Sequence, residues 1–276
     1  MNDEGAPRRP SKLFFVAVVV LVIAAAWLYF RDPAPVPQAP PPSPPAPEAE
    51  REPLVRHPVP EAPAVAESAA EEEVSPLAEH LVEELPDLEE SDSAIERVAR
   101  YLVSNPELAE LLVTTDAIRR LVSTVDSLTG ESLPLAHLPA KVPAGRFLVL
   151  ERGDRQVIDE RNFARYEPHV ALLGSLDGTE LAQAYAHFYP LFQEAWRDLG
   201  KGGYFNDRLI EVIDHLLEGP EALSPLLLEQ PSVAYVYADP ALEAQSSGRK
   251  LLLRMGPENA AAVKARLRDL RATLVR

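Results

Sequence analysis

The sequence predicts a mainly α-helical domain that follows a single transmembrane helix and a proline-rich linker. Three observations support this fold class. An uninterrupted apolar run lies near the N-terminus, 14 of the 28 prolines fall between Arg31 and Pro76, and apolar residues recur at helical spacing after Leu77. We therefore expect a compact multi-helix domain with a short β-hairpin over residues 77–276.

The apolar run Leu13–Phe30 contains 18 residues and no charge, which is just enough to cross a hydrocarbon core of about 30 Å as a helix. Three basic residues precede the run, and a single one, next to an acid, follows it. By the positive-inside rule we expect residues 1–12 in the cytoplasm and the remainder of the chain outside it. A signal peptide cleaved after Ala24–Ala26 is the alternative, and it also exports the domain.

The stretch 31–76 is rich in proline, alanine and glutamate and lacks the apolar content needed to fold. We expect it to be disordered and polyproline-like, with a reach of at most about 140 Å at about 3.1 Å per residue. A passive tether is the simplest interpretation, and a site for a proline-binding partner is the alternative.

Composition excludes several functional classes. The net charge of −16 argues against nucleic-acid binding, which needs a basic surface. The absence of cysteine excludes disulfides, thiolate zinc sites and cysteine nucleophiles. Charge is also uneven, because Arg249–Arg276 has a net of +6 on an otherwise acidic chain. We expect this basic end to dock on the acidic body, and a basic surface for an acidic partner or anionic lipid is the alternative.

The first half of the domain is predicted to form three helices and a hairpin. The helices are expected within 91–105, 105–113 and 114–128, with a capping box at Ser93–Glu96 and Asn105 as an N-cap. Prolines then predict an irregular segment over 133–145. Phe147–Leu150 and Gln156–Ile158 flank a predicted turn at Gly153.

The second half returns to helical periodicity. A helix over 162–176 is expected to be interrupted near Pro168, and the next helix carries an aromatic stripe and a kink at Pro190. The stripe is interpreted as core, with a peptide groove as the alternative; it consists of Tyr185, Phe188, Tyr189, Phe192 and Trp196. A strand at Val233–Tyr237, one helix from Pro240 to Met255 and a last helix from Pro257 complete the prediction.

The most polar helix of the chain lies within Gly202–Pro220. At about 100° per residue, its charged side chains share one arc and its leucine, isoleucine and valine side chains share the other, as in a surface helix. Asn206 is a suitable N-cap at its start. We predict a contact surface for a partner or ligand at this helix, formed by Tyr204, Asn206, Asp207, Arg208, Glu211 and His215.

The same helix face also permits chemistry. Glu211 and His215 lie one turn apart and are able to share a metal with Asp207, or to act as an acid–base pair. However, the chain has no G-x-S-x-G, H-E-x-x-H, P-loop or G-x-G-x-x-G motif, and no two histidines lie three or four apart. The sequence therefore assigns no catalytic, cofactor-binding or metal-binding residue.

Six stretches of the folded part carry a family resemblance. They are Asp116–Leu128, Pro143–Val149, Asn162–Leu173, Tyr189–Gly200, Gly203–Leu217 and Arg249–Leu267. In these stretches the chain resembles the bacterial family catalogued as domain of unknown function 3014 (DUF3014). The resemblance implies a single-pass envelope protein of Gram-negative bacteria with its domain behind a proline-rich linker. It implies no activity, and therefore no catalytic residue.

Together these features favour a protein-interaction or scaffold module without a cofactor. We expect it to be anchored in the inner membrane by Leu13–Phe30, to project its domain into the periplasm, and to bind an envelope protein rather than nucleic acid. One alternative is a periplasmic hydrolase or metal-dependent enzyme that uses the face of Asp207, Glu211 and His215. The other is a small-ligand sensor whose aromatic stripe lines a cavity.

Overall fold

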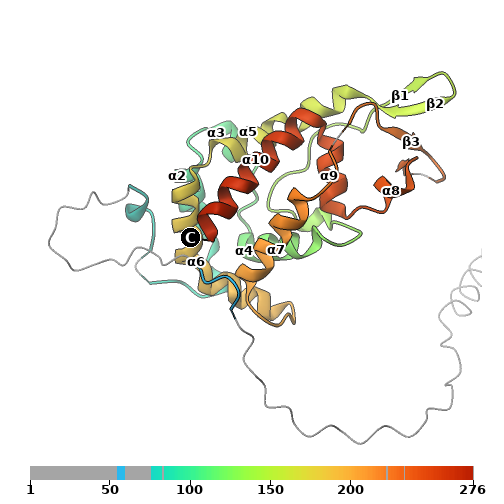
Figure 1. Ribbon diagram of the computed structural model, residues 1–276. Coiled ribbons are helices and arrows are strands. Elements are labelled where there is room, and N and C mark those ends of the chain that lie inside the picture. The colour runs from blue at the N-terminus through green and yellow to red at the C-terminus, as the bar shows by residue number, and fades with distance from the viewer. Residues whose placement is uncertain (1–54, 60–75, 83, 222, 233, 276) are drawn as a thin grey trace, which may run out of the picture. The chain divides into compact units, whose positions relative to one another are not determined.

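The domain is mainly helical, as the sequence predicts (Figure 1). The computed structural model describes residues 55–59, 76–82, 84–221, 223–232 and 234–275. The predicted cytoplasmic segment 1–12, the transmembrane helix 13–30 and most of the linker 31–76 lie outside these residues. Within them, no helix has both the length and the hydropathy needed to span a bilayer.

The three helices expected first are present. They are α2 (Asp92–Leu102), α3 (Pro106–Ala109) and α4 (Ala117–Ser127), preceded by the 3-10 turns η1 (Pro76–Glu79) and η2 (Leu88–Glu90). Asn105 caps α3 as predicted, because its side-chain oxygen accepts the N–H of Glu107 at 2.9 Å. The predicted capping box at Ser93 is wrong: the N-cap position is Ser91, two residues earlier, so Ser93 lies inside the first turn of α2.

The predicted β-hairpin is one half of a four-stranded antiparallel sheet. The strands are β1 (Val149–Arg152), β2 (Arg155–Ile158), β3 (Leu227–Glu229) and β4 (Val236–Tyr237), in the order β1-β2-β3-β4. The turn is where the sequence places it, at Gly153, whose φ of 67° is a left-handed conformation. β4 lies within the strand predicted at Val233–Tyr237. β3 was not predicted, because it becomes a strand only by pairing with β2, through Val157 and Leu227, and with β4.

The middle of the chain forms a 3-10 segment and two helices. These are η4 (Glu160–Tyr166), α5 (Glu167–Ser175) and α6 (Gly178–Asp198), with the turn η3 (Leu135–His137) before the sheet. The interruption expected near Pro168 is the change from η4 to α5, and the proline lies in the first turn of α5, where its missing N–H costs little. Pro190 lies within α6.

The aromatic stripe of α6 belongs to the hydrophobic core, as predicted. Phe188, Phe192 and Trp196 are buried, with 2%, 8% and 5% of their surface exposed. Tyr185 and Tyr189 lie at the edge of the same cluster, which also includes apolar residues of α2 and α4. Most of the stripe is therefore buried where α6 packs against α2 and α4.

The C-terminal part contains more elements than the sequence indicates. They are α7 (Phe205–Leu217), α8 (Pro240–Glu243), α9 (Ser247–Met255) and α10 (Pro257–Leu274). The single helix predicted from Pro240 to Met255 is wrong, because the chain breaks into α8 and α9 at Ser246. The hydroxyl of Ser246 caps α9 by accepting the N–H of Arg249 at 3.3 Å.

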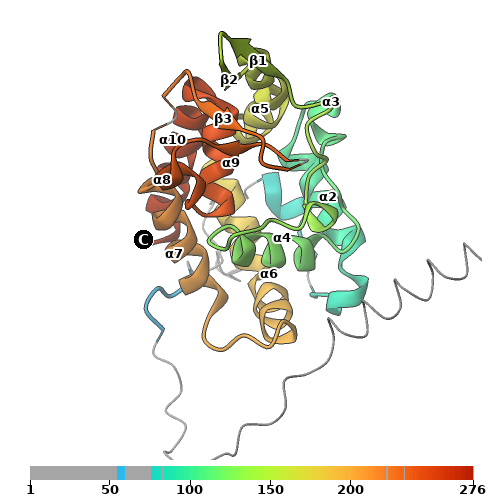
Figure 2. The same cartoon turned by 90° about the vertical axis from the view of Figure 1, so that its right-hand side faces the viewer.

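The basic terminal helix α10 docks on the body of the domain, as expected. It packs against α5, α6, α7 and α9 (Figure 2). Its apolar seam is anchored at both ends, since Ala260 and Leu274 are 5% and 1% exposed. Charge contributes as well: Arg271 pairs with Asp214 of α7, and the Lys264 ammonium donates to the carbonyl of Gly219 at 2.6 Å.

A buried asparagine joins the sheet to the helical part. Asn162 is fully buried, and its amide donates to the carbonyls of Leu148 and Asp159 at 2.6 and 2.7 Å. Its oxygen accepts the N–H of Leu148 at 2.9 Å. These bonds satisfy the amide in the interior and hold the chain before β1 against η4.

Candidate functional site

The start of α7 is fixed by side chains of α6. The oxygen of Gln193 accepts the N–H of Phe205 at 2.9 Å, and its amide donates to the carbonyl of Gly203 at 3.0 Å. The indole N–H of Trp196 donates to the carbonyl of Gly202 at 3.1 Å. Gln193 therefore satisfies a main-chain donor that a helix normally leaves free, in place of an N-cap side chain. Sequence reasoning missed Gln193, because it lies on a different helix.

Asn206 does not cap α7, although the sequence predicts that role. The helix begins at Phe205, after Tyr204 at the N-cap position, so Asn206 lies inside the first turn and is fully buried. Its oxygen accepts the hydroxyl of Tyr185 at 3.1 Å. Its amide donates to the main-chain carbonyl of His57 at 3.0 Å. Asn206 thus connects the aromatic core to a segment about 150 residues earlier in the chain.

Asp207 binds the same segment. One carboxylate oxygen accepts the main-chain N–H of His57 at 2.7 Å, and the other accepts that of Arg56 at 3.2 Å. Only 6% of Asp207 is exposed, so its predicted place on the water-facing arc is wrong. The physical reason is that residues 55–59 cover this end of the helix. We call Asn206 and Asp207 the main-chain clamp.

The next residues of α7 connect it to α4. The guanidinium of Arg208 donates to the hydroxyl of Thr129 at 2.6 Å and pairs with Asp126 at 3.3 Å. Glu211 lies between two cations, 3.2 Å from Arg208 and 3.9 Å from Arg56. The predicted residues Arg208 and Glu211 therefore do lie beside the clamp, and both are engaged in ion pairs.

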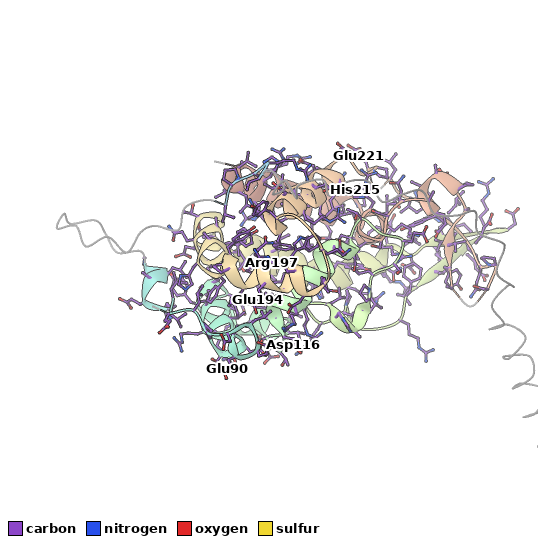
Figure 3. All side chains as sticks on the ribbon, turned by 90° about the horizontal axis from the view of Figure 1, so that it is seen from below. Glu90, Asp116, Glu194, Arg197, His215 and Glu221 are labelled. Atoms are coloured by element: carbon purple, nitrogen blue, oxygen red, sulfur yellow. The ribbon has the colours of Figure 1, made fainter. Side chains whose placement is uncertain are left out.

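The far end of the same face meets the C-terminal helices. Asp214 pairs with Arg271 of α10, and His215 contacts the hydroxyl of Ser246 through Nε2 at 2.8 Å. Burial lowers the pKa of His215, and the nearby Arg249 lowers that pKa further. Figure 3 shows His215 on the opposite side of the domain from Asp116.

A polar cavity of about 520 Å³ lies over this face. It is lined by Arg56, His57, Thr129, Asp207, Arg208, Ile210, Glu211, Asp214, His215 and Glu218. Four of the six predicted contact residues thus line one cavity. Asn206 and Tyr204 are not part of its lining: Asn206 is fully buried, and Tyr204 occupies the N-cap position of α7.

Two further histidines and an arginine of the domain are engaged away from this face. His169 contacts the carbonyl of Lys141 at 2.7 Å, and His187 packs edge-on against Phe188. Arg254 lies over the ring of Tyr237. Among the described residues, no group of three or more histidine, aspartate or glutamate side chains is placed to hold a metal ion. The arrangement on α7 is suited to holding a polypeptide main chain.

Residues Arg56 and His57 were not predicted as site residues. They lie in the stretch 31–76, which the sequence suggests is a disordered tether. A weak signal was present, since "LVRH" interrupts the proline- and glutamate-rich composition with apolar and basic residues. Composition alone does not say where such a segment binds.

The family model for "protein of unknown function (DUF3014)" matches residues 117–271, which is more than half of the chain. The chain belongs to the DUF3014 family. The matched part of this DUF3014 protein runs from α4 into α10 and includes the clamp and the part of the cavity lining that lies between Thr129 and Glu218. Residues 55–59 lie outside the match. No curated protein and no solved structure matches the chain significantly.

Two histidines give the DUF3014 domain an expected pH dependence. Burial lowers the pKa of His187 and of His215, and in the latter the cations Arg249 and Arg208 oppose the acids Glu218 and Glu211. The unfolded chain therefore binds more protons than the folded chain below the ordinary histidine pKa of about 6.5.

We accordingly expect the contribution of these two neutral histidines to the free energy of unfolding to be present above that pH. This contribution should be lost as the pH falls from 7.5 to 5.5. Thermal unfolding followed by circular dichroism checks this. His187→Gln and His215→Gln should each reduce the fall in Tm over this interval, and the double variant should reduce it most. An identical fall in all four proteins would show that other groups control it.

Proposed function

We propose that this DUF3014 protein is a non-enzymatic interaction module anchored in the inner membrane. The anchor is the apolar run Leu13–Phe30, and the stretch 31–76 tethers the domain in the periplasm. The charge distribution around the run supports this topology. The net charge of −16 favours a protein partner over nucleic acid.

One observation carries the proposal: side chains at the start of α7 bind the main chain of a segment of the same protein that is about 150 residues away in sequence. Three hydrogen bonds join the clamp to Arg56 and His57. Protein modules commonly take peptide segments through main-chain bonds of this kind, with side-chain pockets adding specificity. The cavity around the clamp supplies such a pocket.

The engagement of the polar side chains favours binding over catalysis. The carboxylate of Asp207 is occupied by two main-chain N–H groups, and that of Asp214 by Arg271. His215 has a lowered pKa and a serine partner, without a carboxylate in hydrogen-bond contact among the described residues. A general acid–base pair needs its partners free to exchange protons with a substrate.

A small-ligand sensor receives less support. An apolar cavity of about 270 Å³ does lie beside Tyr185 and Phe192, next to Leu270 and Leu274 of α10. This volume falls just below the range of about 300–1,000 Å³ in which most small-molecule sites lie. Trp196 is not part of its lining, and Phe188 is 2% exposed.

The test is site-specific photo-crosslinking in cells. A photoreactive residue at Glu218, whose side chain is 76% exposed at the rim of the cavity, should give a discrete crosslinked protein. The matched control is Glu107, an exposed residue of α3, which should not give that product. A reporter fusion after residue 276 should show activity in the periplasm. A cytoplasmic reporter, or identical products from both positions, would contradict the proposal.

A further inference from the structure

The clamp recognises main chain rather than side chains. Asp207 accepts two successive N–H groups, and Asn206 donates to the carbonyl that follows them. The segment 55–59 contains no helix or strand and bends at Arg56 and His57, so its polar main-chain groups need partners from elsewhere. Hydrogen bonds to a carboxylate are among the stronger ones in proteins, and here they hold an otherwise irregular segment.

Hydrogen bonds within the domain preorganise the clamp for binding. The Tyr185 hydroxyl donates to the oxygen of Asn206, which turns the amide group of Asn206 toward the segment. Gln193 and Trp196 hold the loop before the clamp by their bonds to Gly203 and Gly202. A rigid, desolvated pair of polar groups binds a peptide at a smaller entropic cost than a flexible pair.

Charge selects among peptides. The guanidinium of Arg56 lies 3.9 Å from Glu211, and the same cavity is lined by Asp214 and Glu218, whose own partners are Arg271 and Arg249. A basic side chain at this position is therefore favoured over an acidic one. Pro58 follows the clamped residues and confines His57 to conformations outside the helical region.

The clamp and its occupant belong to different parts of the chain. Asn206 and Asp207 lie within the residues that the DUF3014 model matches, whereas 55–59 lie outside them. We propose that the clamp is a binding site for a short basic peptide, occupied in cis by Val55–Val59 and in trans by a basic segment of a partner protein. This inference rests on the proposed interaction function and names the chemistry of the partner.

The two occupants must compete. A segment joined to the same chain is present at an effective concentration on the order of millimolar. A peptide supplied in solution therefore binds weakly until the cis segment is displaced or disabled. Because the clamp binds main-chain groups, replacing side chains of the cis segment should not release it from the clamp. Removing the N–H groups of Arg56 and His57 should release it.

The experiment measures binding of a fluorescein-labelled peptide, Pro53–Pro60 of this sequence, to the purified full chain in detergent by fluorescence anisotropy. In the double variant Arg56→Pro, His57→Pro the cis segment lacks both donors, and we expect at least tenfold tighter peptide binding than to the wild type. The matched control Arg56→Ala, His57→Ala keeps both donors. This control should bind the peptide less than threefold more tightly than the wild type does.

The binding site itself is tested on both molecules. Asp207→Asn in the double-proline background should weaken binding at least tenfold, because the carboxylate acceptor is lost. A peptide methylated on the main-chain nitrogen of His57 should bind at least tenfold more weakly than the unmodified peptide. A peptide methylated on the main-chain nitrogen of Val59 is its control. The peptide variants leave the protein intact, so their result does not depend on how well Asp207→Asn folds.

Equal affinity for the wild type and the double-proline variant would overturn the cis occupancy. Equal affinity for the two methylated peptides, or no binding to any protein, would overturn the clamp as a peptide site. If the crosslinked partner of Glu218 is found but the peptide does not bind, the interaction function stands and this inference fails. If the peptide binds as expected but the domain is cytoplasmic, the clamp stands and the proposed function fails.

Discussion

Replacing Phe205 by alanine is expected to lower the free energy of unfolding by about 3–5 kcal/mol, as for other buried phenylalanines. Only 2% of Phe205 is exposed, and its ring stacks on Phe192 at 5.8 Å and contacts Trp196 at 5.9 Å between centroids. Truncation leaves a cavity between α6 and α7. Since Phe205 directly precedes the clamp, the variant should also weaken binding of residues 55–59.

Chemical denaturation of the full chain in detergent, followed by far-ultraviolet circular dichroism, measures this effect. Leu223→Ala is the control, because Leu223 is 70% exposed and should change the free energy by less than about 0.5 kcal/mol. A loss below about 1 kcal/mol for Phe205→Ala would contradict the packing described at the start of α7.

Gly256→Ala is expected to destabilise the fold by about 2–6 kcal/mol. Gly256 joins α9 to α10 with φ 83° and ψ 167°, a backbone region that is costly for any residue with a side chain. An added Cβ would also lie 2.5 Å from the ring of Phe163, which cannot be accommodated without movement. Strain and overpacking each contribute about 1–3 kcal/mol.

Gly200→Ala is the control for a positive φ without a steric clash. Its φ is 71°, but no atom lies within 4 Å of the added Cβ, so it should show backbone strain alone. In the same denaturation experiment, Gly256→Ala should lose more stability than Gly200→Ala. Adding Phe163→Ala to Gly256→Ala should cost less than the sum of the two single losses, because the clash is relieved. Equal losses for the two glycine variants would rule out the clash.

The helical part of the fold could be predicted because its signals are local. Apolar periodicity and a cap such as Asn105 lie within the elements that they define, and Asn105 caps α3 as the sequence predicts. The aromatic stripe of α6 could be assigned to the core for the same reason. The division at Ser246 was missed because the helical pattern continues across it.

The sheet and the site depend on contacts between distant segments. β3 has only three residues, and its pairing partner β2 lies about 70 residues earlier in the chain. On α7, the pattern correctly predicts which residues lie together and incorrectly predicts that Asp207 faces water. A helical wheel shows which side of a helix is polar, but it does not show what covers that side.

By itself, the sequence determined the class of the domain, the family, the order of most helices and the residues that gather at the start of α7. The family rests on the resemblance of six stretches, and the other three follow from spacing within a few turns of chain. Only the tertiary structure decided what those residues bind, because the partner of Asn206 and Asp207 is a main-chain segment about 150 residues away. Main-chain N–H and C=O groups are present at nearly every residue, so no pattern of side chains marks the segment that a clamp will hold.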